Sequence, residues 1–196
     1  MVFLIIALVL VLLDQVTKYL VSVNIPYGET VSVISGFFDL TYVRNPGSAF
    51  SFLAGTDWGI YVLIAISAVA SLVFLYLLLF KSKKFPFWLR VINVVLLAGT
   101  LGNFIDRVRY RSVVDFLQFT FGSYVFPIFN VADICVVLST IGLALFVLFD
   151  KEFFADKKKD SDSSEKHEEP ASDEEVVEGI SEDELPDGEQ KAEVTV

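Results

Sequence analysis

The sequence predicts an all-α membrane protein of four transmembrane helices, with a small extracytoplasmic β element and a disordered acidic C-terminal tail. Three observations predict this fold class. Hydrophobic residues fill 54% of 196 positions, which is high for a soluble protein and ordinary for a membrane protein. Four segments are long and apolar enough to cross a bilayer. The charges are segregated, because residues 1–156 carry no net charge and residues 157–196 carry all of the formal −10.

The four apolar segments cover residues 2–23, 58–80, 87–105 and 131–149. The second is uncharged, and its 23 residues would span about 34 Å as a helix. The first is interrupted by Asp14, Gln15 and Lys18. A cleavable signal peptide is the alternative for this segment, but it lacks a basic start and a cleavage motif.

The C-terminal segment 157–196 has no aromatic residue and few apolar ones. Such a segment cannot bury enough surface to offset the entropy of the ordered chain, so we expect a disordered acidic cytoplasmic tail. The membrane body is expected to cover residues 1–156. The low isoelectric point therefore describes the tail and says nothing about the charge of a partner of the body.

Lysine and arginine predict the orientation, because cytoplasmic loops carry an excess of them. Eight flank the turn between the second and third segments or follow the fourth, and four lie on the other side. Both termini are therefore expected in the cytoplasm. The four on the other side, which we attribute to a functional site, are Arg44, Arg107, Arg109 and Arg111.

The outer segments 24–57 and 108–129 are too long for plain loops. Residues 31–34 and 40–43 are predicted strands separated by Ser35-Gly36. The second outer segment is rich in Val, Phe and Tyr, so it is a candidate for further strands. We expect a small sheet that rests on the membrane surface.

Cysteine and histidine are too scarce for several kinds of chemistry. Cys135 lies in an apolar run and His167 lies in the acidic tail, and each is the only residue of its type. Ser-His-Asp hydrolysis, Cys-His proteolysis and zinc catalysis all need a histidine near the chemistry. An enzyme of this sequence must work with carboxylates, and we expect no metal, no cofactor and no nucleic-acid partner.

Two carboxylates beside the helices have no basic neighbour in sequence. Asp115 lies in the second outer segment and Asp133 at the outer start of the fourth apolar segment, so antiparallel helices return both to one boundary. Two carboxyls that face each other in a medium of low dielectric constant share a proton. One then activates water as a base and the other polarises a carbonyl. The sequence leaves open which is the base.

Two other carboxylates have basic neighbours. Asp14 and Lys18 stand at i and i+4, which is compatible with a local ion pair or with a direct role at the site. Asp106 precedes Arg107, and a pair with this guanidinium would suit a positioning role. A structural carboxylate is the alternative for each acid taken alone, although a carboxylate at mid-membrane costs about 2.5–3.5 kcal/mol.

Five blocks in this order resemble the lipoprotein signal peptidases, also called signal peptidase II. The resemblance covers the body from the first to the fourth apolar segment, whereas the acidic tail is outside the family pattern. The blocks are Asp14-Gln15-Val16-Thr17-Lys18, Arg44-Asn45-Pro46-Gly47-Ser48-Ala49-Phe50, Gly102-Asn103-Phe104-Ile105-Asp106-Arg107, Val114-Asp115-Phe116 and Phe129-Asn130-Val131-Ala132-Asp133.

The resemblance implies an aspartyl endopeptidase at the outer face of the bacterial plasma membrane. Its substrate would be a diacylglyceryl-modified prolipoprotein, cut just before the lipidated Cys, with membrane lipids around it and globomycin-type inhibitors as ligands. Asp115 and Asp133 would be catalytic. Residues that would bind the substrate or support the site are Asp14, Lys18, Asn45, Gly47, Asn103, Asp106, Arg107 and Asn130.

Two other functions are alternatives for a membrane protein with carboxylates in or near its helices. A small four-span proton-coupled transporter would also use carboxylates within the membrane. It does not explain acids gathered at one boundary or an ordered outer segment. A presenilin-type protease would need a Gly-x-Gly-Asp motif, which the sequence lacks.

Overall fold

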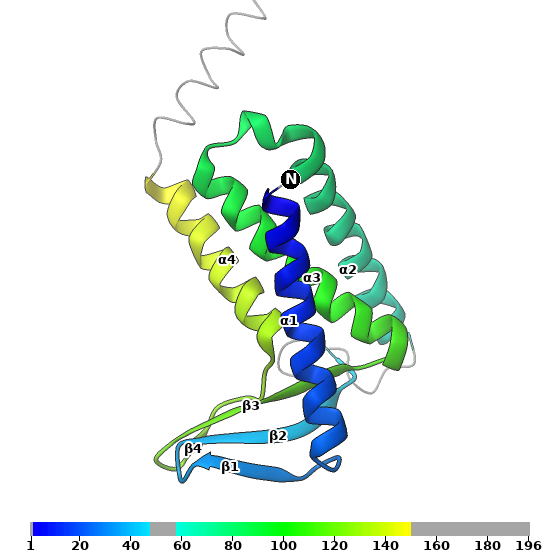
Figure 1. The fold of residues 1–196 in the computed structure, drawn as a ribbon, viewed down its shortest axis with the longest axis vertical. Coiled ribbons are helices and arrows are strands. Elements are labelled where there is room, and N and C mark those ends of the chain that lie inside the picture. Colours follow the sequence, from blue (N-terminus) through cyan, green and yellow to red (C-terminus); the bar gives the residue numbers. More distant parts are fainter. Residues whose placement is uncertain (1, 48–57, 150–196) are drawn as a thin grey trace, which may run out of the picture. The chain divides into compact units, whose positions relative to one another are not determined.

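The computed structural model describes residues 2–47 and 58–149 (Figure 1). The expected tail, 157–196, and His167 lie outside the described residues, as does part of the first outer segment. Four helices are long and apolar enough to cross a membrane. They are α1 (Val2–Asn24), α2 (Gly59–Tyr76, continued by a π turn at Leu77–Lys81 and a 3-10 turn at Ser82–Lys84), α3 (Phe87–Tyr110) and α4 (Val131–Phe149).

Helix α3 is the centre of the bundle, because it packs against each of the other three helices (Figure 1). Two glycines bring its neighbours close. A Cβ at Gly99 would lie 2.6 Å from the carbonyl oxygen of Ala132 in α4. A Cβ at Gly102 would lie 2.5 Å from Oδ2 of Asp14 in α1. Small residues of this kind allow helix backbones to approach closely in membrane proteins.

Helix α3 extends beyond the expected 87–105 and ends at Tyr110. The apolar run ends at Ile105, but the backbone stays helical for one more turn because Asp106 has partners inside the protein. Arg111 ends the helix in the left-handed region with φ 54°, and its N–H donates to the carbonyl of Arg107 at 3.0 Å.

The strands form one antiparallel sheet at one end of the helices (Figure 1). Its order is β1 (Thr30–Ile34), β2 (Phe38–Asn45), β3 (Val113–Phe121) and β4 (Tyr124–Val125). The expectation of a small sheet is thus confirmed, and the second outer segment supplies two of its strands. In the central pair, Val114 lies opposite Arg44 and Asp115 opposite Val43.

One face of the sheet packs against the end of α1. Val21 and Ile25 form a buried cluster with Tyr42, Val114 and Phe116. Successive side chains of a strand point to opposite faces, so Asp115 points away from this cluster. The packing of Val114 and Phe116 therefore fixes the direction of the Asp115 side chain.

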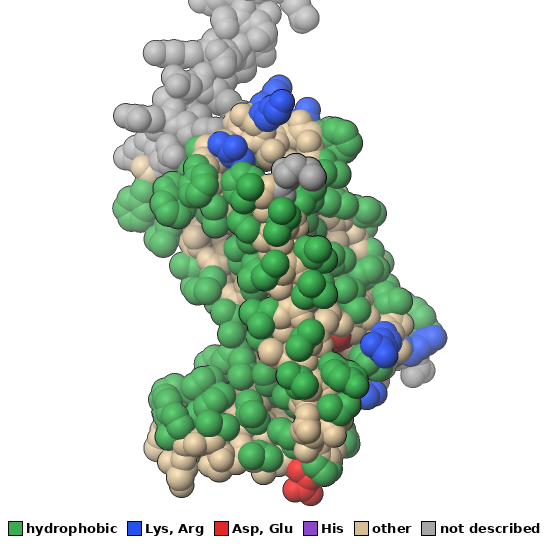
Figure 2. Space-filling view, in the orientation of Figure 1, with side chains coloured by type: hydrophobic (Ala, Val, Ile, Leu, Met, Phe, Trp, Pro, Cys, Tyr) green, Lys and Arg blue, Asp and Glu red, His purple; other side chains and the backbone are tan. Residues whose placement is uncertain are grey.

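The outer surface of the helices is apolar. Many large hydrophobic side chains are exposed along them, including Leu12, Leu72 and Leu138. Figure 2 shows this apolar surface with basic side chains gathered near its two ends. Such a surface fits a protein surrounded by lipid.

Candidate active site

Asp133 is held at the start of α4 by a reciprocal pair of hydrogen bonds with Asn130. The backbone N–H of Asp133 donates to Oδ1 of Asn130 at 2.9 Å. The backbone N–H of Asn130 donates to Oδ2 of Asp133 at 3.1 Å. This is a capping box, in which the first and fourth residues of a helix start satisfy one another's free N–H groups. It turns the Asp133 carboxyl back toward the sheet.

The Asn130 side chain also links the carboxylate of Asp115 to the backbone N–H of Asp133. Its Nδ2 donates to Oδ1 of Asp115 at 2.6 Å, so one side chain contacts both Asp115 in β3 and Asp133 in α4. Asn130 has no exposed surface. A buried amide with this many partners has one defined orientation, so it fixes the two acids relative to each other.

Asn103 of α3 is the second amide at the site. Its Nδ2 donates to Oδ1 of Asp133 at 2.8 Å. Its Oδ1 accepts hydrogen bonds from Lys18 at 3.1 Å and from Asn130 at 3.2 Å. Lys18 is a donor only, so it requires the amide oxygen of Asn103 on its side and the amide nitrogen toward Asp133.

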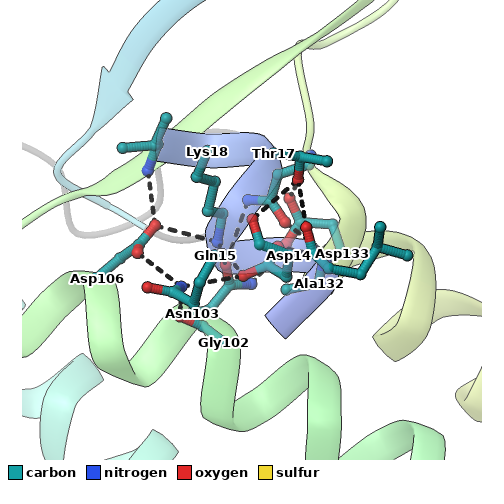
Figure 3. A network of polar contacts seen from close by, with 12 residues as sticks. Asp14, Gln15, Thr17, Lys18, Gly102, Asn103, Asp106, Ala132 and Asp133 are labelled. Carbon is teal, nitrogen blue, oxygen red and sulfur yellow. Dashed lines mark hydrogen bonds and ion pairs between the residues drawn. The ribbon is translucent and has the colours of Figure 1, made fainter. Parts of the chain in front are cut away.

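Lys18 links α1 to this network (Figure 3). Its Nζ lies 2.9 Å from Asp14 and 3.0 Å from Asp106, in addition to its bond to Asn103. The side chain is buried, and these three acceptors match the three donors of an ammonium group. The predicted Asp14–Lys18 ion pair is therefore present, within a larger cluster.

The ion-pair partner of Asp106 differs from the expectation. Its carboxylate pairs with Lys18 of α1, and not with the adjacent Arg107. Neighbouring residues of a helix point in different directions, so Asp106 and Arg107 cannot face each other. Asp106 accepts further hydrogen bonds from Gln15 Nε2 and from the backbone N–H of Val114, both at 3.1 Å. The second bond fixes β3 beside Asp115.

Asp14 has a corresponding role for α4. Its Oδ1 accepts the backbone N–H of Ala132 at 2.8 Å (Figure 3). The first N–H groups of a helix lack partners within the helix, and a negative charge there is favoured by the helix dipole. Asp14 therefore stabilises the start of α4, one residue before Asp133.

The proton affinity of Asp115 differs markedly from that of an ordinary aspartate. Burial, followed by the charge of Asp133, raises the pKa of Asp115 from 3.8 to about 7. Three weaker effects lower this pKa: a hydrogen bond from Asn130, a hydrogen bond from Asn45 and the charge of Lys18. A carboxyl with this pKa can hold or release a proton near neutrality.

Three other predicted site residues lie around the acids. Asn45, at the end of β2, hydrogen bonds Asp115 and accepts the N–H of Gly47 at 3.0 Å. Gly47 is thus connected to the site through Asn45. Arg107 interacts electrostatically with Asp106, Asp115 and Asp133. Among the residues that the structure describes, its buried Nε has no hydrogen-bond partner.

The structure therefore brings all the predicted site residues into one region. Sequence reasoning missed Gln15, whose Nε2 donates to Asp14, Asp106 and the carbonyl of Gly102. The signal was present, since Gln15 is a polar residue inside an apolar segment. Within the described ranges, no group of three or more His, Cys, Asp or Glu side chains could hold a metal ion.

The fold and this arrangement define a class: a multi-pass membrane protein with paired carboxylates at one end of its helices. Residues 6–149 match the family model described as Signal peptidase (SPase) II. The chain belongs to this peptidase family.

Curated relatives and solved structures agree with this assignment. The lipoprotein signal peptidase of Enterococcus faecalis is 44% identical over 151 residues, covering 77% of this chain and 90% of the relative. That of Bacillus pumilus is 42% identical over 146 residues, covering 74% and 92%.

Two solved structures, each titled as a bacterial membrane enzyme, are also similar. One, at 2.3 Å, has a TM-score of 0.67 and 31% identity, covering 87% of this chain and 94% of the other. The second, at 1.9 Å, has a TM-score of 0.66 and 33% identity, covering 76% and 94%. The transporter alternative is not supported by these matches.

Proposed function

We propose that this protein is an aspartyl endopeptidase that removes signal peptides from diacylglyceryl-modified prolipoproteins, cutting just before the lipidated Cys. The names of the relatives support the lipoprotein substrate. The observation that carries the aspartyl mechanism is the contact of one fully buried side chain, Asn130, with both Asp115 and Asp133.

The dyad holds one proton in the reactive state. The pKa of about 7 for Asp115, raised by burial and by Asp133, supports a shared proton at neutral pH. The ionised carboxylate takes a proton from a water molecule, and the water oxygen attacks the scissile carbonyl carbon. The protonated carboxyl donates to the carbonyl oxygen. As the C–N bond breaks, the dyad donates a proton to the leaving amine and takes one from a hydroxyl of the tetrahedral intermediate, so it ends singly protonated as it began.

The groups around the dyad are suited to position a peptide. The Nε of Arg107 is a buried donor with no hydrogen-bond partner among the described residues, so a substrate carbonyl would satisfy it. Asn45 and Asn103 keep the carboxyls oriented through their amide groups. Asp14, Lys18 and Asp106 act behind them by fixing the start of α4 and the strand that carries Asp115.

The position of the dyad suits a lipid-modified substrate. Asp133 lies in the first turn of α4 and Asp115 in the strand beyond the end of α3. Ends of membrane-spanning helices lie near the headgroups of the bilayer. A diacylglyceryl chain holds the cleavage point at that depth.

Substitution of the dyad tests the function. In purified enzyme supplied with a diacylglyceryl-modified peptide, Asp115→Asn and Asp133→Asn should each abolish nearly all cleavage while the protein stays folded. Asp39→Asn, the same change on β2, should cleave at the wild-type rate. Asp106→Asn should lower the melting temperature clearly, whereas the turnover of the enzyme that remains folded should change little. Normal turnover by either dyad variant would rule out this mechanism.

Inhibitors provide a second test. A globomycin-type inhibitor should compete with the lipidated peptide, because its hydroxyl would lie between the two carboxyls. Chelators and serine-directed reagents should leave cleavage unchanged. Loss of activity with a chelator would require a metal-dependent mechanism instead.

The proposed orientation places both termini in the cytoplasm and the dyad at the outer face. Single-cysteine labelling can test it, since Cys135 is buried and contributes little background. Ser82→Cys, in the turn after α2, should react only from the cytoplasmic side. Ser123→Cys, between β3 and β4, should react from outside, and the reverse pattern would invert the topology.

A further inference from the structure

A cleft beside the ion cluster is lined by two arginines that the peptidase mechanism does not use. It lies between the end of α1, strand β2 and the last turn of α3. We call it the arginine cleft and define it by Tyr19, Ser22, Tyr42, Arg44, Arg109 and Tyr110, all of which line it. The cleft is shallow and open to solvent, with an enclosed volume of about 30 Å³.

The two arginines are held close together. The guanidinium carbon of Arg44 lies 4.8 Å from the centre of the Tyr110 ring, and that of Arg109 lies 4.9 Å from the same centre. Arg44 is further fixed because its Nε donates to the hydroxyl of Tyr42 at 2.9 Å. The two carbons are therefore at most about 10 Å apart. A phosphate group bound beside Tyr110 is therefore within reach of both of these long side chains.

Neither arginine is neutralised by a carboxylate in the part of the chain that the structure describes. The ion pairs found there both belong to Lys18. The acid that lines the cleft, Asp106, already pairs with Lys18 and accepts hydrogen bonds from Gln15 and Val114. Two like charges that share one ring repel each other, and a bound anion would remove that cost.

The dipole of α3 accounts for only part of this arrangement. Cations are favoured at the C-terminal end of a helix, which explains Arg109 in the last turn. Arg44 belongs to β2, so the dipole of α3 does not explain why its side chain lies over Tyr110.

The cleft lies at the depth of the lipid headgroups, which indicates that the anion belongs to a lipid. Its walls come from the last turns of two membrane-spanning helices, where the bilayer presents its headgroups. In Figure 2, basic side chains gather beside the junction of the helices and the sheet. Tyrosines, of which Tyr19 is 62% exposed, are the side chains that prefer this level.

We propose that the arginine cleft binds the phosphate of an anionic phospholipid headgroup. The guanidinium groups of Arg44 and Arg109 donate to the phosphate oxygens. The bound lipid fixes the depth of the sheet end in the bilayer. The proposal does not depend on the catalytic mechanism, because binding is measured without turnover.

The experiment measures binding of soluble short-chain lipids to the purified full-length protein. The probes are dihexanoyl phosphatidylglycerol, dihexanoyl phosphatidylcholine and inorganic phosphate. Wild-type protein should bind phosphatidylglycerol most tightly. The double variant Arg44→Gln/Arg109→Gln should bind it at least about tenfold more weakly, since two charge-assisted contacts are lost. Arg111→Gln is the matched control, because Arg111 contacts Tyr61 and does not line the cleft.

Four results would overturn the proposal. Unchanged phosphatidylglycerol affinity in the folded double variant would exclude the cleft. Equal affinity for inorganic phosphate would identify a site for a free anion, and equal affinity for phosphatidylcholine would exclude selection of an anionic lipid. If only the KM for lipidated peptide rises in the double variant, the cleft belongs to the substrate. Should the double variant unfold, Arg44→Lys/Arg109→Lys keeps the charge and loses the planar fork, and it should bind phosphatidylglycerol more weakly than Arg111→Lys.

Discussion

Replacing Gly99 with alanine would test whether the position of the α4 start controls cleavage. The new Cβ would lie 2.6 Å from the carbonyl oxygen of Ala132 and 2.8 Å from Cγ2 of Val136. Ala132 directly precedes Asp133, and its carbonyl is backbone that cannot rotate away as a side chain can. The steric conflict is relieved only if α3 and α4 separate.

The size of this separation follows from the contact distances. Ordinary contact of a Cβ begins at 3.4 Å, so the 2.6 Å approach requires a shift of about 0.8 Å. Misplacement of a reacting group by about 1 Å can cost about a hundredfold in rate. The overpacking costs about 1–3 kcal/mol, and the better helix propensity of alanine offsets about 1 kcal/mol of it. We therefore expect a larger loss in rate than in stability.

Gly142→Ala is the matched control, because Gly142 also lies where α4 packs against α3 but is eleven residues from the start of α4. Its Cβ would lie 3.3 Å from the flexible side chain of Ile92. Cleavage of a lipidated peptide should fall by about ten- to a hundredfold in Gly99→Ala, and by little in Gly142→Ala. Both rates are to be divided by the amount of folded enzyme. Gly99→Ala enzyme that is folded and cleaves at the wild-type rate would refute the reasoning.

Three further predictions follow from the same network and from the charge distribution. Lys18→Met leaves the buried carboxylates of Asp14 and Asp106 without their cation, so the free energy of unfolding should fall by about 3–5 kcal/mol, whereas exposed Lys84→Met should unfold like the wild type in a thermal melt. The pKa of Asp115 is raised from 3.8 to about 7, so its contribution to stability is full below pH 3.8 and is lost as the pH rises through about 7. Cleavage should decline over the same upper range as the dyad loses its proton, and a pH-rate profile that stays flat to pH 9 would contradict this. A chain that ends after Asp156 should cleave at close to the full-length rate per inserted molecule, because charges in aqueous salt are screened within about 8 Å; a several-fold slower rate at normal abundance would show that residues 157–196 affect the mechanism.

Sequence reasoning succeeded where the signal is local. A run of about 20 apolar residues identifies a candidate membrane helix without knowledge of its neighbours. The i, i+4 spacing of Asp14 and Lys18 likewise predicts a contact within one helix. The prediction that Asp115 and Asp133 act as a pair rests on a longer-range rule, that antiparallel helices return the chain to the same boundary, and it stays a prediction.

The remaining features depend on contacts between distant segments. Asp106 was expected to pair with Arg107, but the fold brings Lys18 of another helix to it. The contribution of Gln15 was missed because its partners Asp106 and Gly102 belong to α3. The last turn of α3 was missed because charged residues within it resemble a loop, although the buried partners of Asp106 keep this turn helical.

The cluster around Lys18 has a consequence for how the protein is made. Asp14 and Lys18 enter the membrane with the first helix, when their partners from the other helices are still absent. Asp106 arrives with the third helix, and the N–H of Ala132 that completes the bonds of Asp14 arrives with the fourth. The bridge through Asn130 also requires the start of α4. The contacts that hold Asp115 and Asp133 are therefore assembled last during synthesis. On the proposed mechanism, a nascent chain still in the insertion machinery cannot yet cut neighbouring polypeptides.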